Sequence, residues 1–306
     1  MRDLTVMSRL ANRAKREALF GVSPVRRLAE KRHEQRLQRH VSHLKALAAA
    51  DRDVVDRIRD YGVHVTTLDA LALPGTARVK GPLDRLVEEL AALPPTSGVL
   101  RPPRGDILAD LAVWRFGLSD RMLDIAENYL GVPVRYYYYY PDVRREVANR
   151  GRSSASQDQY RDIHHWHRDH EDYQILKLFV WLNDVDADGG PFGYIPRTRS
   201  AEVASRLRYV SGFTSDEKVR RIAPEDEWHR ATGPKWTAVM ADTGQVFHRV
   251  TPGQVRDRYS VTFTYTSRRP IVNFPPETFT PDEQRRVREG LSARQLACLP
   301  RGLSPK

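Results

Sequence analysis

The chain has 306 residues, of which 40% are hydrophobic and 29% are charged. This is the composition of a folded, soluble protein with enough apolar residues for a buried core, and it excludes disordered and membrane-spanning chains. No run approaches the ~18 apolar residues of a membrane span, and the single cysteine, Cys298, excludes an internal disulfide. We therefore expect a cytoplasmic protein.

Positive charge is concentrated at the start of the chain. The net charge is +11, but residues 1–50 alone carry +8, so the remaining residues carry only +3. These first residues form a predicted basic helical extension in two pieces, split near residues 21–24. A basic amphipathic segment can bind nucleic acid or a membrane surface. However, no aromatic residues alternate with the arginines, so nucleic-acid binding is disfavoured. A helix docked on the body of the protein is the simpler interpretation.

The next part of the chain is predicted to be mainly helical. A helix over residues 51–61 ends at Gly62, and a β-branched strand follows at residues 63–67. Residues 93–105 are rich in proline and glycine and are predicted to be a loop. Ser119 then caps a helix that ends at Gly131. Its apolar residues recur at helical spacing and are expected in the core: Met122, Ile125, Ala126 and Tyr129.

From residue 132 the pattern changes to strands. Residues 134–140 contain five consecutive tyrosines, and the period of two places Tyr137 and Tyr139 on one face, where they could line a cavity. The polar residues 141–163 suit a mobile loop over the mouth of a site. Further predicted elements are strands at 175–182, 236–240, 245–250 and 259–266, a helical insert at 200–210, and a C-terminal helix that begins with the capping box Thr280-Pro281-Asp282-Glu283. We expect a single domain over residues 51–306, of α+β class, with a mainly β core at about residues 130–268.

A cluster of histidines precedes the strand at 175–182. We expect this segment to be a strand, in which the period of two makes His167 and Asp169 project from the same face, so an imidazole and a carboxylate can converge on a metal. His170 and Asp172 have the same spacing and form the alternative pair. We prefer the first pair because His167 directly follows Trp166. His165 and His170 are then candidates for substrate contacts or for residues behind the ligands.

A second histidine and an arginine occur later in the chain. His248 is the candidate third ligand, because two imidazoles and one carboxylate on one side of a metal are typical of non-haem Fe(II) oxygenases. Ten residues later, Arg258 and Ser260 share one face of a strand. Such a guanidinium and hydroxyl suit the distal carboxylate of 2-oxoglutarate. Arg256 has the same parity and is the alternative anchor.

Short runs around these candidates resemble those of a known family. They are Trp166-His167-Arg168-Asp169, residues 177–185, Gly190-Pro191-Phe192, Tyr194-Ile195-Pro196, and Asp242-Thr243 with Phe247-His248-Arg249. Together they resemble the phytanoyl-CoA dioxygenase family of Fe(II)- and 2-oxoglutarate-dependent oxygenases, over about residues 130–268. One departure is Arg197-Thr198-Arg199-Ser200, where a Gly-Ser-His-like turn is usual. The resemblance implies a double-stranded β-helix core flanked by helices, with Fe(II) held by His167, Asp169 and His248, and 2-oxoglutarate held by Arg258.

The sequence therefore predicts a dioxygenase that hydroxylates an unactivated C–H bond of a small molecule, such as a secondary or lipid-like metabolite, and converts 2-oxoglutarate and O2 to succinate and CO2. Desaturation and cyclisation use the same ligands and stay open. Halogenation is less favoured because Asp169 fills the position that a halide needs. From another class, the chain could be a non-catalytic metal-binding scaffold with a nucleic-acid-binding arm. Lys177 and Trp181 are further candidates for substrate contacts, and Lys177 must reach solvent, a carboxylate or a ligand. The oligomeric state is not predicted.

Overall fold

The computed structural model describes residues 14–15, 17–94, 98–136, 141–148, 164–252, 255–272, 279–299 and 303. Tyr137, Tyr139, most of the predicted mobile loop and the first 13 residues of the basic extension lie outside these ranges. In the described part of the chain, no helix is long and apolar enough to cross a membrane.

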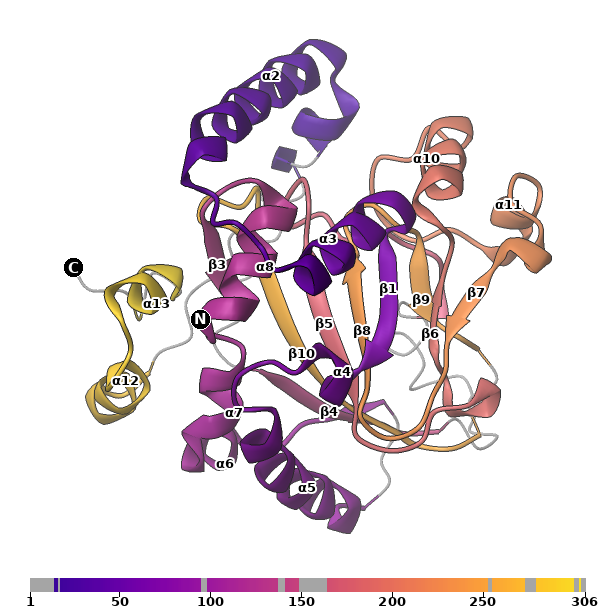
Figure 1. The fold of residues 1–306 in the computed structure, drawn as a ribbon. Coiled ribbons are helices and arrows are strands. Elements are labelled where there is room, and N and C mark those ends of the chain that lie inside the picture. Colours follow the sequence, from indigo (N-terminus) through magenta and orange to yellow (C-terminus); the bar gives the residue numbers. More distant parts are fainter. Residues whose placement is uncertain are drawn as a thin grey trace.

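Two antiparallel sheets form the centre of the molecule (Figure 1). The larger sheet has the strand order β1-β8-β5-β10-β4-β2, with β3 also paired to β10, and the smaller sheet has the order β7-β6-β9. Their bounds are Val63–Thr67 (β1), Val99–Leu100 (β2), Val134–Tyr136 (β3), Asp142–Glu146 (β4), Leu176–Trp181 (β5), Phe192–Tyr194 (β6), His229–Ala231 (β7), Thr237–Asp242 (β8), His248–Val250 (β9) and Arg258–Ser267 (β10).

The order of the strands along the chain is that of a double-stranded β-helix. The chain passes from β5 in the larger sheet to β6 and β7 in the smaller one, returns to β8, crosses again to β9 and comes back as β10. Strands that alternate between two facing sheets in this way form a double-stranded β-helix. The predicted fold class, a mainly β core flanked by helices, is confirmed.

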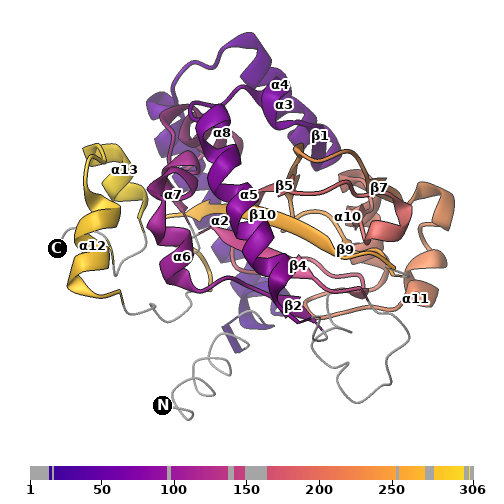
Figure 2. The same cartoon turned by 90° about the horizontal axis from the view of Figure 1, so that it is seen from below.

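Helices cover the outer face of the larger sheet, and the described elements at both ends of the chain are also helical. Figures 1 and 2 both place the C-terminal helices at the end of the molecule opposite the three-stranded sheet. The helical elements are η1 (Glu17–Gly21), α2 (Ser23–His40), η2 (Val41–His43), α3 (Ala49–Tyr61), α4 (Leu68–Leu71), α5 (Thr76–Ala92), α6 (Arg104–Ala109), α7 (Leu111–Phe116), α8 (Asp120–Leu130), η4 (Ala187–Gly189), α10 (Arg197–Arg206), α11 (Asp216–Arg220), η5 (Glu225–Glu227), α12 (Pro281–Arg288) and α13 (Ala293–Cys298).

The main core lies between these helices and the outer face of β5, β8 and β10. Leu178 and Val180 of β5 and Phe263 of β10 are at most 1% exposed and belong to the same apolar cluster as the buried residues of α5, α7 and α8. The cluster includes the four α8 residues predicted to be in the core, which confirms that prediction. Because a strand has a period of two, the neighbours of these residues must face the smaller sheet.

Helix ends follow the sequence signals closely. Gly62 ends α3 in the left-handed region with φ 82°, and Thr280 and Glu283 form the predicted capping box of α12. Ser119 does precede α8, but its side chain makes no capping hydrogen bond, so that prediction was wrong in its mechanism. The prediction that residues 141–163 are entirely loop was also wrong, because β4 pairs with β10 over Asp142–Glu146. Pairing with a long central strand compensates for the weak β propensity of this charged segment.

The N-terminal helix α2 has no buried residue. It contacts the body through single side chains, including His33, whose ring stacks on Tyr173 with 4.4 Å between centroids. Burial and the nearby Arg36 lower the pKa of His33 from 6.5 to about 4. The predicted break in the helical extension is present, since α2 begins at Ser23 with Pro24 in its first turn.

Candidate metal centre

The segment that carries His167 and Asp169 is extended, but it is not a regular strand. His167 forms an isolated antiparallel bridge with His248, donating to its carbonyl at 3.1 Å and accepting from its N–H at 2.9 Å. The neighbouring Trp166 bridges Thr214. Directly opposed residues of an antiparallel pair place their side chains side by side, so the two imidazoles are adjacent, with 4.3 Å between ring centroids. The prediction of a strand at this position was therefore correct only in its extended backbone.

A tight turn at Asp242, Thr243 and Gly244 holds the other end of this segment. The Asp169 N–H donates to the Thr243 carbonyl at 2.8 Å, and Arg168 Nε donates to the Gly244 carbonyl at 2.7 Å. The turn is itself fixed by the buried Asp242 carboxylate, which accepts from the N–H of Gly244 at 3.0 Å. His248 lies shortly after the same turn, so one local structure positions all three candidate ligands.

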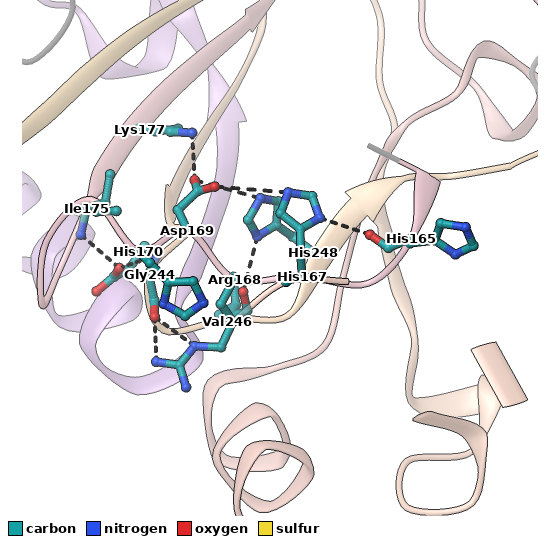
Figure 3. A network of polar contacts seen from close by, with 12 residues as sticks. His165, His167, Arg168, Asp169, His170, Ile175, Lys177, Gly244, Val246 and His248 are labelled. Atoms are coloured by element: carbon teal, nitrogen blue, oxygen red, sulfur yellow. Dashed lines mark hydrogen bonds and ion pairs between the residues drawn. The ribbon is translucent and has the colours of Figure 1, made fainter. Parts of the chain in front are cut away.

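The three side chains converge (Figure 3). His167 Nε2 lies 4.0 Å from Asp169 Oδ1, and His248 Nε2 lies 3.8 Å from Asp169 Oδ2. One ligand atom from each of these three residues lies within 4.8 Å of the other two. Among the described residues, these are the His, Cys, Asp or Glu side chains that lie close enough together to hold a metal. Bonds of ~2.0–2.2 Å from such atoms would meet at an ion between them.

Hydrogen bonds orient both imidazoles for metal binding. His167 Nδ1 lies 2.9 Å from the His165 carbonyl, and His248 Nδ1 lies 3.2 Å from the Val246 carbonyl. Because a carbonyl can only accept, each Nδ1 carries a proton, and each Nε2 is the ring nitrogen directed at Asp169. A backbone carbonyl behind the distal nitrogen is the usual support of a metal-binding histidine. The residues present therefore fit a divalent metal.

The charges of the site also favour a metal-binding state. Burial lowers the pKa of His248 from 6.5 to about 3, with a further contribution from His167, so its imidazole is neutral at neutral pH. Burial alone would raise the pKa of Asp169, but the nearby Lys177 ammonium outweighs burial and holds that pKa below its usual range. A neutral imidazole at His248 and an ionised carboxylate at Asp169 are the protonation states that a metal requires.

Lys177 contacts a carboxylate, which is one of the three kinds of partner expected from the sequence. Its Nζ donates to Asp169 Oδ2 at 2.6 Å from the inner face of β5. Glu171 lies nearby, and burial followed by repulsion from Asp169 raises its pKa to about 7. Glu171 was missed at the sequence level, because nothing in the pattern distinguishes it from the acidic residues beside it, Asp169 and Asp172.

Arg258 lies on the inner face of β10 and is 5% exposed. Its guanidinium pairs with Glu146 of β4, donates to the Gly190 carbonyl and lies over the Trp181 ring, 5.1 Å from the centroid. Ser260 shares this face and is also buried. The alternative anchor, Arg256, is a surface residue that pairs with Asp186, so the structure does not support that alternative.

The structure separates the remaining candidates from the three converging side chains. The His165 ring points away from them (Figure 3), and His170 Nε2 lies 3.4 Å from the Tyr209 hydroxyl instead. Asp172 accepts from the backbone N–H of Ser267 at 2.8 Å, so His170 and Asp172 do not converge as the alternative pair. Trp181 is 1% exposed and donates to the Ala231 carbonyl, which makes it part of the packing between the sheets.

Two residues that contact the candidate site residues were not predicted from the sequence. Glu146, the partner of Arg258, lies in a segment predicted to be loop, and residues 142–146 contain a single apolar residue, so no sequence pattern marks them as a strand. Phe213 packs edge-on against the His167 ring at 5.1 Å between centroids while remaining 50% exposed. No sequence signal relates Phe213 to His167, since only the tertiary fold brings them together.

Several solved structures are similar to this chain. EctD from S. alaskensis, solved with 2-oxoglutarate and 5-hydroxyectoine, is 19% identical over 74% of this chain and 80% of that chain, with a TM-score of 0.46. HygX from Streptomyces hygroscopicus, solved with nickel and 2-oxoglutarate, is 15% identical over 73% and 88%, with a TM-score of 0.45. The epimerase SnoN, solved with Fe3+, alpha ketoglutarate and nogalamycin RO, is 18% identical over 72% and 84%, with a TM-score of 0.43. No protein-family model and no curated protein matches the chain, so the resemblance to the phytanoyl-CoA dioxygenase family stays a prediction.

Proposed function

We propose that this protein is an oxygenase that uses Fe(II), 2-oxoglutarate and O2 to hydroxylate a C–H bond of a small molecule. The observation that supports this most strongly is the convergence of His167, Asp169 and His248 with both Nε2 atoms directed at the carboxylate. Three ligands from one side leave the opposite positions of a metal free, as a non-haem iron oxygenase requires. When bound, the iron and its cosubstrate would supply the oxidising chemistry.

The role of the protein is then to hold the ligands and to restrain the carboxylate. The backbone bridge between His167 and His248 sets the spacing of the imidazoles, and Lys177 bonds to Asp169 Oδ2. A carboxylate held at one oxygen by an ammonium offers the other oxygen to the metal. Desaturation or cyclisation would use the same ligands, so the choice among these outcomes depends on the substrate.

Arg258 is the proposed anchor for the distal carboxylate of 2-oxoglutarate, with Ser260 on the same strand face. Its burial and its planar guanidinium favour a strong two-point bond to a carboxylate. The carboxylate of Glu146 now pairs with Arg258, so the cosubstrate would have to displace it. Arg144 lies 3.6 Å from Glu146 Oε1 and can keep that carboxylate paired after the exchange.

Aromatic rings lie between this anchor and the candidate metal ligands. Phe192 stacks on His248 with 5.4 Å between centroids and contacts Phe179 of β5 at 5.1 Å. Gly190, whose carbonyl accepts from Arg258, precedes Phe192 by two residues. An apolar wall of this kind excludes water from a reacting centre and strengthens the charge interactions within it.

An anaerobic titration tests the proposal. Adding Fe(II) and 2-oxoglutarate to the metal-free protein should produce a weak visible charge-transfer band, and His167→Ala should abolish it. Admission of O2 should then release succinate from 2-oxoglutarate. A band without succinate would instead support the non-catalytic scaffold, and a protein that binds no Fe(II) would disprove both interpretations. His165→Ala is the matched control, because the His165 ring points away from the site and its carbonyl is retained.

A further inference from the structure

A cavity of about 720 Å³ lies next to the candidate metal centre, between the end of α10 and the start of α11. Four of its described lining residues carry a positive charge, and none of the described lining residues is acidic. They are Arg206, Arg208, Lys218 and Arg221. The hydroxyl-bearing residues Tyr209, Ser211 and Thr214 line the same space. The Tyr209 hydroxyl donates to the Gly212 carbonyl and the Ser211 hydroxyl donates to Glu17, so the argument for an anion depends on the cations.

One wall of this cavity contacts the segment that carries the candidate ligands. Phe213 lies edge-on against the His167 ring at 5.1 Å, and the Thr214 N–H donates to the Trp166 carbonyl at 2.9 Å. The Tyr209 hydroxyl accepts from the Arg168 N–H at 3.2 Å. A molecule bound in the cavity therefore lies directly beside the segment on which His167 and Asp169 are placed.

The cations are only partly neutralised by the protein. Arg206 lies 3.5 Å from Glu202 and Arg221 pairs with Glu217, but both glutamates lie outside the lining, and these pairs are largely exposed to solvent. Within the part of the chain that the structure describes, neither Arg208 nor Lys218 forms an ion pair. The cavity thus keeps an excess of positive charge.

The backbone at Arg208 provides a second observation. Arg208 follows the end of α10 with φ 48°, in the left-handed region that favours glycine. The Tyr209 N–H bonds to the Ala204 carbonyl at 2.9 Å, which completes the helix-ending turn in which the left-handed residue is usually glycine. An arginine here is a local cost to folding, and strained residues of this kind concentrate at binding sites.

We propose that this cavity binds an anionic group of the substrate, a phosphate or a carboxylate, beside the metal centre. That the bound anion belongs to the substrate rests on the proposed function. That the cavity binds an anion does not. Arg208 and Lys218 would provide the charge, and Phe213 would separate the bound anion from His167. The substrate class is then a small molecule with an anionic group at one end and the oxidised carbon at the other.

Calorimetric titration of the metal-free protein with inorganic pyrophosphate and with citrate tests the anion site and distinguishes the two chemistries. We expect one of them to bind, and Arg208→Gly and Lys218→Gln each to weaken that binding about tenfold. Arg208→Gly should not lower the thermal unfolding temperature, because glycine suits the left-handed backbone. Ala72→Gly is the matched control, since Ala72 has φ 47° far from this cavity, and its anion affinity should stay unchanged. Absence of binding, or unchanged affinity in both cavity variants, would overturn the proposal.

A second measurement tests the link to the metal centre. With the paramagnetic metal Co(II) loaded, nuclear relaxation of the bound anion (³¹P for pyrophosphate, ¹H for citrate) should be enhanced relative to the Zn(II)-loaded protein. Anion binding without enhancement would place the anion away from the metal and disprove its role in substrate recognition. If no metal binds at all, the proposed function fails, while the calorimetric result still decides whether the cavity is an anion site.

Discussion

The two faces of the larger sheet differ sharply although they share the same strands. On the outer face, Leu178 and Val180 of β5 and Phe263 of β10 pack against helices. On the inner face, Lys177 of β5 and Arg258 and Ser260 of β10 face the smaller sheet. Because neighbouring residues along a strand point in opposite directions, the same two strands provide stability on one side and a binding surface on the other.

This difference teaches where substitutions should affect folding and where they should affect function. The outer face contains closely packed apolar side chains, so loss of volume there should destabilise the protein. The inner face contains buried charged groups that are stabilised mainly by one another, such as Arg258 with Glu146 and Lys177 with Asp169. Their loss should therefore change binding and the response to a metal or to pH.

The largest effect is expected on the outer face. Phe263→Ala removes a ring that is 1% exposed and that packs on Phe116 at 5.3 Å between centroids. The free energy of unfolding should fall by about 3–5 kcal/mol, because a cavity is left in a rigid core. Urea unfolding measures this change. The Fe(II) affinity of the folded fraction should not change, and a parallel loss of metal binding would contradict the separation of the two faces.

Lys177→Met should destabilise the metal-free protein more than the metal-loaded protein. It removes the ammonium 2.6 Å from Asp169 Oδ2 and leaves a carboxylate that is only 13% exposed without that partner, at a cost of about 3 kcal/mol. A bound divalent metal would compensate the same carboxylate, so the rise in unfolding temperature on adding metal should be larger in the variant.

Lys80→Met is the control for this comparison. Lys80 also pairs with an aspartate, Asp69, at 2.7 Å, but the carboxylate is 65% exposed. A surface pair contributes about 0–1 kcal/mol, and its loss should be independent of the metal. Equal behaviour of the two lysine variants would show that Lys177 has no special relation to the site.

Arg258→Gln should weaken 2-oxoglutarate binding about 10- to 100-fold, because a charge-assisted bond to a carboxylate is lost. The anaerobic titration of the Fe(II) absorption band with 2-oxoglutarate measures the affinity. Arg256→Gln is the matched control: Arg256 has the same parity along the chain, but its side chain is 56% exposed and pairs with Asp186. If both variants bind alike, Arg258 is not the anchor.

The last effect concerns pH and is gradual, and it should come from His248 of β9 in the smaller sheet. His248 has its pKa lowered from 6.5 to about 3, so between these values the unfolded chain binds a proton that the folded chain does not. The contribution of His248 to the free energy of unfolding of the metal-free protein should therefore be fully present above about pH 6.5. It should fall on acidification by ~1.4 kcal/mol per pH unit. The lowered pKa of Asp169 acts in the same direction at lower pH.

Urea unfolding at a series of pH values measures this dependence. His248→Gln should reduce the slope between pH 6.5 and 3, since one titrating group is removed. Phe263→Leu, on the outer face, should lower stability by a similar amount at every pH and leave the slope unchanged. An unaltered slope in His248→Gln would show that His248 is not held neutral by burial.

Local sequence signals predicted much of the framework. Gly62 and the capping box at Thr280 marked helix ends because a left-handed residue and a side-chain cap act within a few residues. The period of two in β10 correctly separated Arg258 from its apolar neighbours. Predictions were wrong where the partner was distant: Asp142–Glu146 forms a strand only because β10 pairs with it, and the His167 segment has only an isolated bridge.

By itself, the sequence determined the chemistry that the chain has available: two imidazoles, one carboxylate and a guanidinium, in a β-rich core, because residue types and short-range periodicity are local properties. The tertiary structure alone decided that His248 bridges His167 and that Lys177 meets Asp169. It also decided that Glu146 pairs with Arg258 and that Phe213 packs on His167. These contacts join residues far apart in the chain, and they depend on which strands pair and in which register, a choice made by the packing of the whole core.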